Sequence, residues 1–139
     1  MVKVDNENKD IYRFICDKLK MNILSNLTLA IVNDKEELLG GIAYYLDNNN
    51  ICHLTVVSNS PYWALPQTLS EILKIGFNDF KAKIIKCEVS HKNTKIIRLL
   101  SGLGLVKEGL LRYARQDGTH EIVFSITEKE FIKKRWYRK

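Results

Sequence analysis

The first half of the chain alternates between segments with helical apolar spacing and segments with strand-like apolar runs. Ile11, Phe14, Ile15 and Leu19 recur at helical spacing, which predicts an amphipathic helix over 9–20. Apolar-rich runs separated by polar turns then predict strands, since short runs of this kind bounded by Asn and Asp are typical of hairpins. A short first strand is expected at 2–4, followed after the helix by an antiparallel meander with strands at 27–32, 38–46 and 51–57.

The second half continues with helix, strand, helix and two further strands. Leu69, Ile72, Leu73 and Phe77 share one helical face, and 84–90 alternates like a strand. Asn93 follows at a position that suits a helix N-cap, because its side chain can accept from free backbone N–H groups. The next helix is predicted to end at Gly102 and Gly104, before strands that begin at Leu105 and at Glu121 and are joined by a hairpin at 116–118.

The unit from Asn93 to Arg112 resembles the C-terminal half of the GNAT acyl-CoA N-acyltransferase fold. The matching residues are Asn93, a short helix, Gly104-Leu105, and Glu108-Gly109 with Arg112 three residues on. The pattern is most similar to ribosomal-protein N-terminal acetyltransferases, with Leu105 in place of the usual Phe. A looser resemblance is to short GNAT-like proteins encoded by tailed phages.

This resemblance implies an α+β fold of three α/β/α layers around a mixed, mostly antiparallel sheet of six to seven strands. The fourth and fifth strands are expected to splay apart, with a bulge after Thr55 or Val56. One domain is expected over 1–132, followed by a basic aromatic tail at 133–139. The second N-terminal helix usual in the family has no room between Lys20 and Leu27.

In the family, the split and the loop after the fourth strand hold acetyl-CoA. The family's loop is rich in glycine, whereas 58–68 contains none. Trp63 stands where the family carries a basic residue, and Pro66 stands at or near a glycine position. Backbone N–H groups at a helix start can still hold an anion, so pyrophosphate binding is expected to persist in a weakened form. The alternative is that the loop holds no phosphate, and that a rigid cap is formed by Pro61, Tyr62, Trp63 and Pro66. For Asn93, plain capping and cofactor contact both stay open. The resemblance places cofactor contacts at Thr55, Val56, Val57, Ala64, Gln67, Thr68, Leu69 and Asn93.

His53 and Tyr113 are the predicted catalytic residues. Amine acylation needs a proton acceptor and a proton donor, and a neutral imidazole suits the first task. His53 lies near the place where many family members carry a Glu, although the sequence slightly favours a half-buried histidine in a strand. The family's usual Tyr is replaced by Leu100, so Tyr113 is a substitute, while Glu88 and His91 are further polar candidates.

Composition narrows the function classes. The chain has 139 residues, 45% hydrophobic and 27% charged, which fits one globular domain. No apolar run approaches the roughly 20 residues of a membrane span, no signal peptide is apparent, and the three cysteines are expected to be reduced, buried thiols. These features predict a cytoplasmic protein with no metal site. The net charge of +6 is the only argument for nucleic acid, which is therefore disfavoured.

The sequence leaves two functions open. The first is an N-acetyltransferase that moves an acetyl group from acetyl-CoA to a primary amine on a protein N-terminus, a lysine or a small molecule. The second is a GNAT-fold protein without catalysis, phage-encoded, with a structural or protein-binding role, which would account for the loop without glycine. A homodimer through the edge of the final strand or the basic tail is compatible with either.

Overall fold

The computed structural model describes residues 3–5, 10–58 and 65–133, with side chains from residue 10 onward. The N-terminal part comprises β1 (Lys3–Asp5), α1 (Ile11–Leu19), β2 (Leu27–Val32), β3 (Leu38–Leu46) and β4 (Ile51–Ser58). The C-terminal part comprises α2 (Pro66–Lys74) with its π-helical extension η2 (Ile75–Asp79), β5 (Ile84–Ser90), α3 (Thr94–Gly102), β6 (Val106–Leu111), β7 (Glu121–Thr127) and α4 (Glu128–Ile132).

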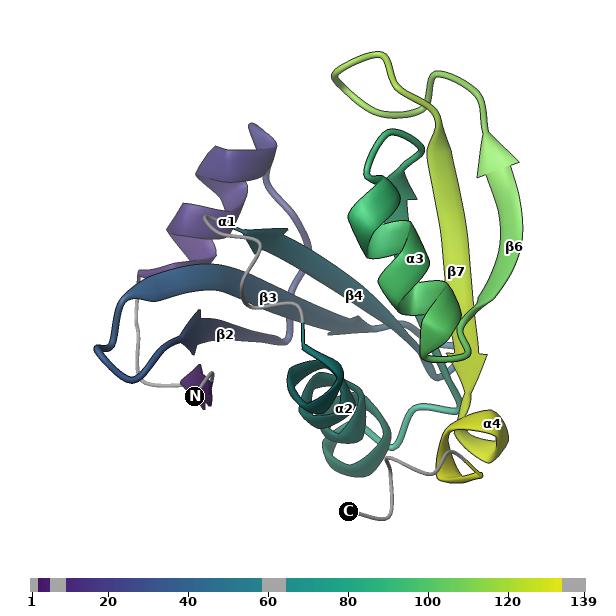
Figure 1. Cartoon of the computed structure of the whole chain (residues 1–139), viewed down its shortest axis with the longest axis horizontal. Helices are drawn as coiled ribbons and strands as arrows, with labels where there is room; N and C mark the ends of the chain where they lie inside the picture. Colours follow the sequence, from purple (N-terminus) through teal and green to yellow (C-terminus); the bar gives the residue numbers. More distant parts are fainter. Residues whose placement is uncertain (1–2, 6–9, 59–64, 134–139) are drawn as a thin grey trace.

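The strands form one seven-stranded sheet in the order β1-β2-β3-β4-β5-β7-β6. Five of the six neighbouring pairs are antiparallel, and β4 with β5 is the parallel pair. In Figure 1 the strands β2–β4 lie across the view while β6 and β7 run steeply, so the two halves of the sheet diverge. The predicted meander and the mixed sheet are therefore confirmed.

Helices cover both faces of the sheet. Ile11 and Ile15 of α1 pack with Ala43 and Val57, and a Cβ on Gly41 would meet Ile15 at 2.8 Å. On the opposite face, α2, α3 and α4 bury their apolar sides in the main core, which also holds the β3 residue Tyr44, the β5 residue Ile85, and the side chains Leu73, Leu100 and Phe131. The three-layer α+β prediction is confirmed.

The predicted splay lies between β4 and β5. Only Ile51–Leu54 of β4 pair with β5, where their partners are Ile84–Cys87. Beyond these residues the two strands do not pair with each other. The expected bulge in β4 is wrong, because β3 and β4 pair without a shift from Leu46–Cys52 to Gly40–Ser58. The split instead arises because β5 continues its pairing with β7 up to Ser90, so that β4 and β5 follow different partners.

Several local predictions can be compared with the structure. Asn93 caps α3, since its side chain accepts from the Ile96 N–H at 3.4 Å. Residues between Lys20 and Leu27 form no helix, as expected. The final strand β7 is not a sheet edge, because β6 lies outside it. The helix α4 was not predicted, although Thr127 and Glu130 form a capping box at its start.

The predicted burial of the three cysteine thiols is confirmed. Cys16, Cys52 and Cys87 are all buried and free. In the described ranges no helix has the length and apolar character needed to span a membrane.

Candidate functional site

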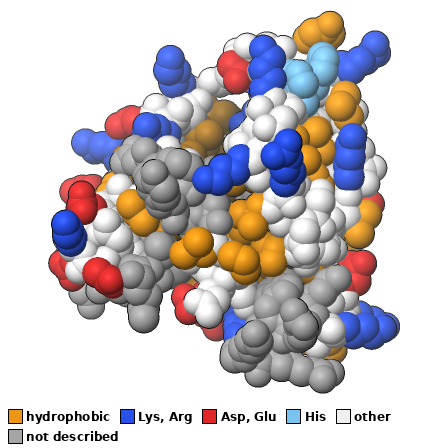
Figure 2. Space-filling model, in the orientation of Figure 1, with side chains coloured by type: hydrophobic (Ala, Val, Ile, Leu, Met, Phe, Trp, Pro, Cys, Tyr) orange, Lys and Arg blue, Asp and Glu red, His pale blue; other side chains and the backbone are white. Residues whose placement is uncertain are grey.

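A narrow cleft occupies the split between β4 and β5. Its volume is about 80 Å³. The last paired residues, Leu54 and Cys87, lie at its closed end, and α2 and α3 cover it from one side of the sheet. Figure 2 shows hydrophobic side chains in the middle of this face and Lys and Arg side chains on and around α3 beside them. The lining residues are Leu54, Val56, Ser58, Leu69, Cys87, Glu88, Val89, Asn93, Ile96 and Leu100.

Strand geometry aims main-chain polar groups of β4 into this cleft. The Asp47 N–H donates to the Ile51 carbonyl across the β3–β4 turn, so Ile51 directs its main-chain groups toward β3. Because these directions alternate along a strand, Val56 and Ser58 direct theirs toward β5. The pairing with β5 ends at Leu54, so the N–H and C=O groups of Val56 and Ser58 have no strand partner.

The β5 side of the cleft follows the same alternation. The His91 N–H donates to the His120 carbonyl and continues the β5–β7 ladder. Glu88, three residues earlier, therefore directs its main-chain groups toward β4 rather than β7. The cleft thus has apolar side chains and unpaired strand edges, which is a suitable environment for an extended chain with amide groups.

The predicted cofactor residues on β4 divide between the two faces of the strand. Val56 lines the cleft, whereas Thr55 and Val57 do not. Thr55 pairs with Ala43 and Val57 pairs with Gly41, so their main-chain groups are directed to β3. Ser58 was missed, although strict alternation from Val56 would have found it.

The helix α2 begins at Pro66, one turn before Leu69, which lines the cleft. Pro66 occupies the first helical position, where it removes no intrahelical bond. The Leu69 N–H donates to the Leu65 carbonyl at 3.0 Å, so the expectation that it faces an anion is wrong. Only the N–H groups of Gln67 and Thr68 remain without a partner inside the helix. The cofactor contact predicted at Ala64 and the rigid cap predicted at 61–63 lie outside the described residues.

Asn93 lines the cleft at the start of α3. Its Oδ1 atom is used for capping, and its own N–H donates to the Ser90 carbonyl. Capping is therefore observed, and Asn93 is also one of the residues that line the cleft.

His53 and Glu88 lie on the α1 face of the sheet at the level where the split begins. The His53 Nε2 atom lies 2.8 Å from the Asp47 Oδ2 atom, and this hydrogen bond is the main reason that the pKa of Asp47 is lowered. His53 pairs with Lys86, whose Nζ atom lies 3.2 Å from the Glu88 Oε1 atom. His53 is not a lining residue of the cleft, but it directly precedes Leu54, which is.

Tyr113 lies away from the cleft, in the loop between β6 and β7. Its side chain is 73% exposed, and its backbone N–H donates to the His120 Nδ1 atom at 3.0 Å. The His120 ring packs against both the Tyr113 ring and the His91 ring. His91, His120 and Tyr113 thus form one cluster that joins the end of β5 to the β6–β7 loop.

Cys87 is the one thiol that lines the cleft among the described residues, and it is poorly suited to act as a nucleophile. Burial raises its pKa to about 12, so the thiol stays protonated at neutral pH. Burial also raises the pKa of Cys52 to about 11. Within the described ranges, no group of three or more His, Cys, Asp or Glu side chains is placed to hold a metal ion.

Of the comparisons with known proteins, the one with solved structures identifies the fold. No family model matches the sequence, and no curated protein matches it. Among solved structures, mutant forms of the spermidine/spermine N-acetyltransferase SpeG from Vibrio cholerae superpose with a TM-score of 0.77 at 12% identity, covering 95% of this chain and 98% of that one. This chain has the GNAT fold.

Two further solved structures show the same GNAT fold. SpeG from Vibrio cholerae in complex with manganese ions has a TM-score of 0.76 at 13% identity and covers 94% of this chain and 95% of that one. A protein from T. thermophilus, provisionally described as an acetyltransferase, has a TM-score of 0.65 at 26% identity. The alignment with the T. thermophilus protein covers 76% of this chain and 61% of that one.

Proposed function

We propose that the protein is an N-acetyltransferase that uses acetyl-CoA and a primary amine. The observation that carries the proposal is the cleft between β4 and β5, in which Val56, Ser58 and Glu88 present main-chain groups without a strand partner. Val56 and Glu88 are only partly buried and Ser58 is exposed, so a ligand can reach these main-chain groups and supply the partners that the sheet does not.

The residues present fit the arm of an acyl-CoA. The cleft is narrow and apolar, so it suits an extended chain, and the unpaired strand edges can bond to the amides of such a chain. At the outer end, the N–H groups of Gln67 and Thr68 can face phosphate oxygens. Without a glycine loop this end is expected to bind more weakly than in typical members of the family.

Direct transfer is favoured over a covalent acetyl-enzyme, because the cleft thiol of Cys87 stays protonated. When bound, acetyl-CoA supplies the acetyl group as a thioester: the amine nitrogen bonds to the acetyl carbon, the carbon–sulfur bond breaks, a base takes the amine proton, and the departing sulfur takes up a proton. His53, oriented by Asp47, is the proposed base, and Glu88 lies on the same face as a second candidate.

The proton donor stays a prediction. Tyr113 carries the right group but lies in the β6–β7 loop, so in this role it would have to reach across to the cleft from a 73% exposed position.

Calorimetric titration with acetyl-CoA tests the proposal. We expect micromolar binding, weakened about tenfold or more in Val56→Trp, because the larger side chain fills the cleft. Val106→Trp is the matched control, since Val106 is 44% exposed on the edge strand β6 and does not line the cleft.

A lack of acetyl-CoA binding would contradict the proposal. If millimolar acetyl-CoA gives neither heat nor a thermal shift, the acetyltransferase proposal is wrong. The protein would then be a GNAT-fold protein kept for binding or assembly, which is the alternative that the sequence leaves open.

A further inference from the structure

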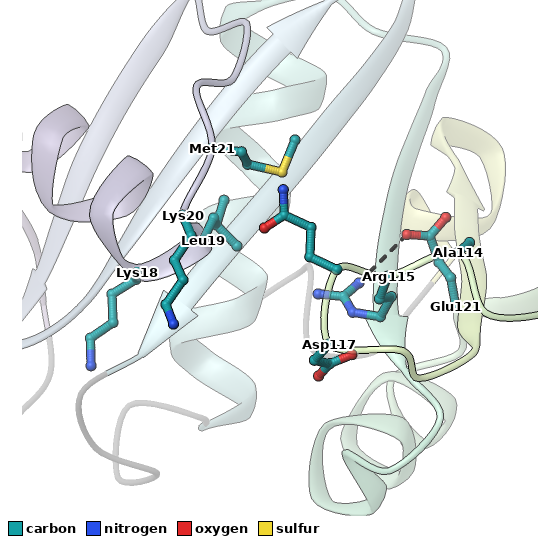
Figure 3. A pocket seen from close by; sticks show the side chains of 9 residues that line it. Lys18, Leu19, Lys20, Met21, Ala114, Arg115, Asp117 and Glu121 are labelled. Atoms are coloured by element: carbon teal, nitrogen blue, oxygen red, sulfur yellow. Dashed lines mark ion pairs between the residues drawn. The ribbon is translucent and has the colours of Figure 1, made fainter.

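A second and larger pocket lies between two loops that are far apart in the sequence. It measures about 520 Å³ and is bounded by the end of α1 on one side and by the β6–β7 loop on the other. Figure 3 shows Lys20 and Met21 on the α1 side of this space, facing Arg115 and Asp117 on the opposite side. A volume of this size is typical of small-molecule sites, which run from roughly 300 to 1,000 Å³.

The pocket opens on the α1 face of the sheet, at the splayed end of β5. Glu121, one of its lining residues, pairs with Ser90, the last residue of β5. Because side chains alternate along a strand, Ser90 and Glu88 share the same face, and Glu121 lies on it too. Glu88 also lines the narrow cleft. The two cavities therefore approach each other at the split, from opposite faces of the sheet.

Positive charge is in excess in this pocket. Three cations line it, Lys18, Lys20 and Arg115, against the two carboxylates Asp117 and Glu121. In Figure 3 the Arg115 guanidinium extends from the β6–β7 loop toward the α1 side, and the Lys20 side chain runs along the α1 side of the space. A polycation would meet net repulsion here, whereas an amine that also carries an anionic group would find partners for both charges.

The charged groups of the β6–β7 loop are held in fixed positions. The Arg115 Nη1 atom lies 3.6 Å from the Glu121 Oε1 atom, which orients the guanidinium and leaves other N–H donors of its fork for a ligand carboxylate. The Asp117 Oδ1 atom accepts from both the backbone N–H and the hydroxyl of Thr119. These hydrogen bonds lower the pKa of Asp117, so it is ionised at neutral pH.

We propose that this pocket binds the acceptor of the reaction, and that the acceptor is a small amine carrying a carboxylate, of the amino-acid class, rather than a polyamine. Lys20 and Arg115 bind the carboxylate, and the amine is directed toward the split, where Glu88 and His53 lie. The proposal rests on the acetyltransferase function proposed above, and it gives this chain an acceptor class different from the spermidine/spermine named for SpeG.

An acceptor panel with acetyl-CoA tests the proposal. The panel contains the common L-amino acids, the methyl ester of the best acceptor, and spermidine. We expect an amino acid to be the best acceptor, and its methyl ester, in which a neutral ester replaces the carboxylate, to have a KM raised by about tenfold or more. Lys20→Glu is expected to raise the KM for the amino acid by a similar factor, while Lys35→Glu, on the β2–β3 turn away from the pocket, serves as the control.

The two proposals fail in different ways. Spermidine as the best acceptor, or a Lys20→Glu variant with an unchanged KM, would overturn the acceptor assignment while leaving the acetyltransferase function intact. If acetyl-CoA does not bind, calorimetry with the amino acids alone tests independently whether the pocket binds them. Binding that is lost in Lys20→Glu supports the pocket, and absence of binding overturns it.

Discussion

Asn93 is both a helix cap and a cleft residue, and the sequence could not tell these two roles apart. It caps α3 through Oδ1, and it lines the cleft between β4 and β5. An Asn at a helix start is fully explained by capping, so its place beside the cleft depends on where the fold brings the split.

Substitution of Asn93 can separate its two roles. Asn93→Asp keeps the capping oxygen but replaces the amide with a negative charge, so stability should change by less than about 0.5 kcal/mol while acetyl-CoA affinity falls. Asn93→Ala should lower the free energy of unfolding by about 1 kcal/mol. Urea unfolding and calorimetry measure the two effects, and unchanged affinity in Asn93→Asp would leave capping as the only role.

His53 is predicted to act in the chemistry and not in cofactor binding. His53→Ala should lower kcat strongly, by about 10²-fold, which is the lower end expected for loss of a general base. Its affinity for acetyl-CoA should stay close to that of the native protein, because His53 does not line the cleft. If Glu88→Gln abolishes turnover while His53→Ala keeps it, the base is Glu88.

At the scale of elements, the split depends on the straight pairing of β3 with β4. Gly40 allows the two strands to approach closely, since a Cβ on it would meet the Val57 carbonyl oxygen at 2.6 Å. On its other side, β3 has a register shift against β2 beside Gly40.

Gly40→Ala should destabilise the protein by about 1–3 kcal/mol, because the contact is with backbone and the strands must separate. Gly102→Ala is the control: nothing lies within 4 Å of its Cβ position at the end of α3, so it should be neutral or stabilising by up to about 1 kcal/mol. Thermal unfolding of both variants provides the comparison. Equal stability of the two would show that the β3–β4 approach is not as close as described.

The β3–β4 hairpin should respond to pH through Asp47. The pKa of this carboxyl is lowered from its ordinary value of 3.8 by the hydrogen bond with His53 and by backbone N–H groups of the turn. Its contribution to stability is therefore present above that value and is lost as the pH falls through the lower pKa of the folded state. Asp47→Asn should remove this part of the acid dependence in urea unfolding, and identical pH profiles would contradict it.

At the scale of the whole molecule, most of the fold was predictable and part of the site was not. The strands at 27–32, 38–46 and 84–90 follow directly from apolar patterning, which depends on local burial. The sequence does not show that Val56 lines the cleft while Thr55 faces β3, or that the Leu69 N–H bonds inside α2. Both facts depend on which hydrogen-bond partner each residue has in the folded chain. The pocket between α1 and the β6–β7 loop could not be predicted, because it joins segments more than ninety residues apart.

We propose that the folded unit ends near residue 132. A chain ending after Ile132 should unfold at the same temperature as the full chain. A chain ending after Thr127 loses α4, including Phe131, which is 1% exposed and lies 5.0 Å from the Phe77 ring. Loss of a buried aromatic of this kind costs about 3–5 kcal/mol, so this shorter chain should be strongly destabilised. A clear drop in the melting temperature on removal of 133–139 alone would place the boundary further on.

Amide NMR during titration with acetyl-CoA is the most direct test of the account. If the unpaired edges of β4 and β5 hold the acyl-CoA arm, the largest shifts will occur at the backbone amides of Val56, Ser58 and Glu88, with smaller changes on β1 and β6. Shifts confined to the basic surface of α3, or none at saturating acetyl-CoA, would contradict it.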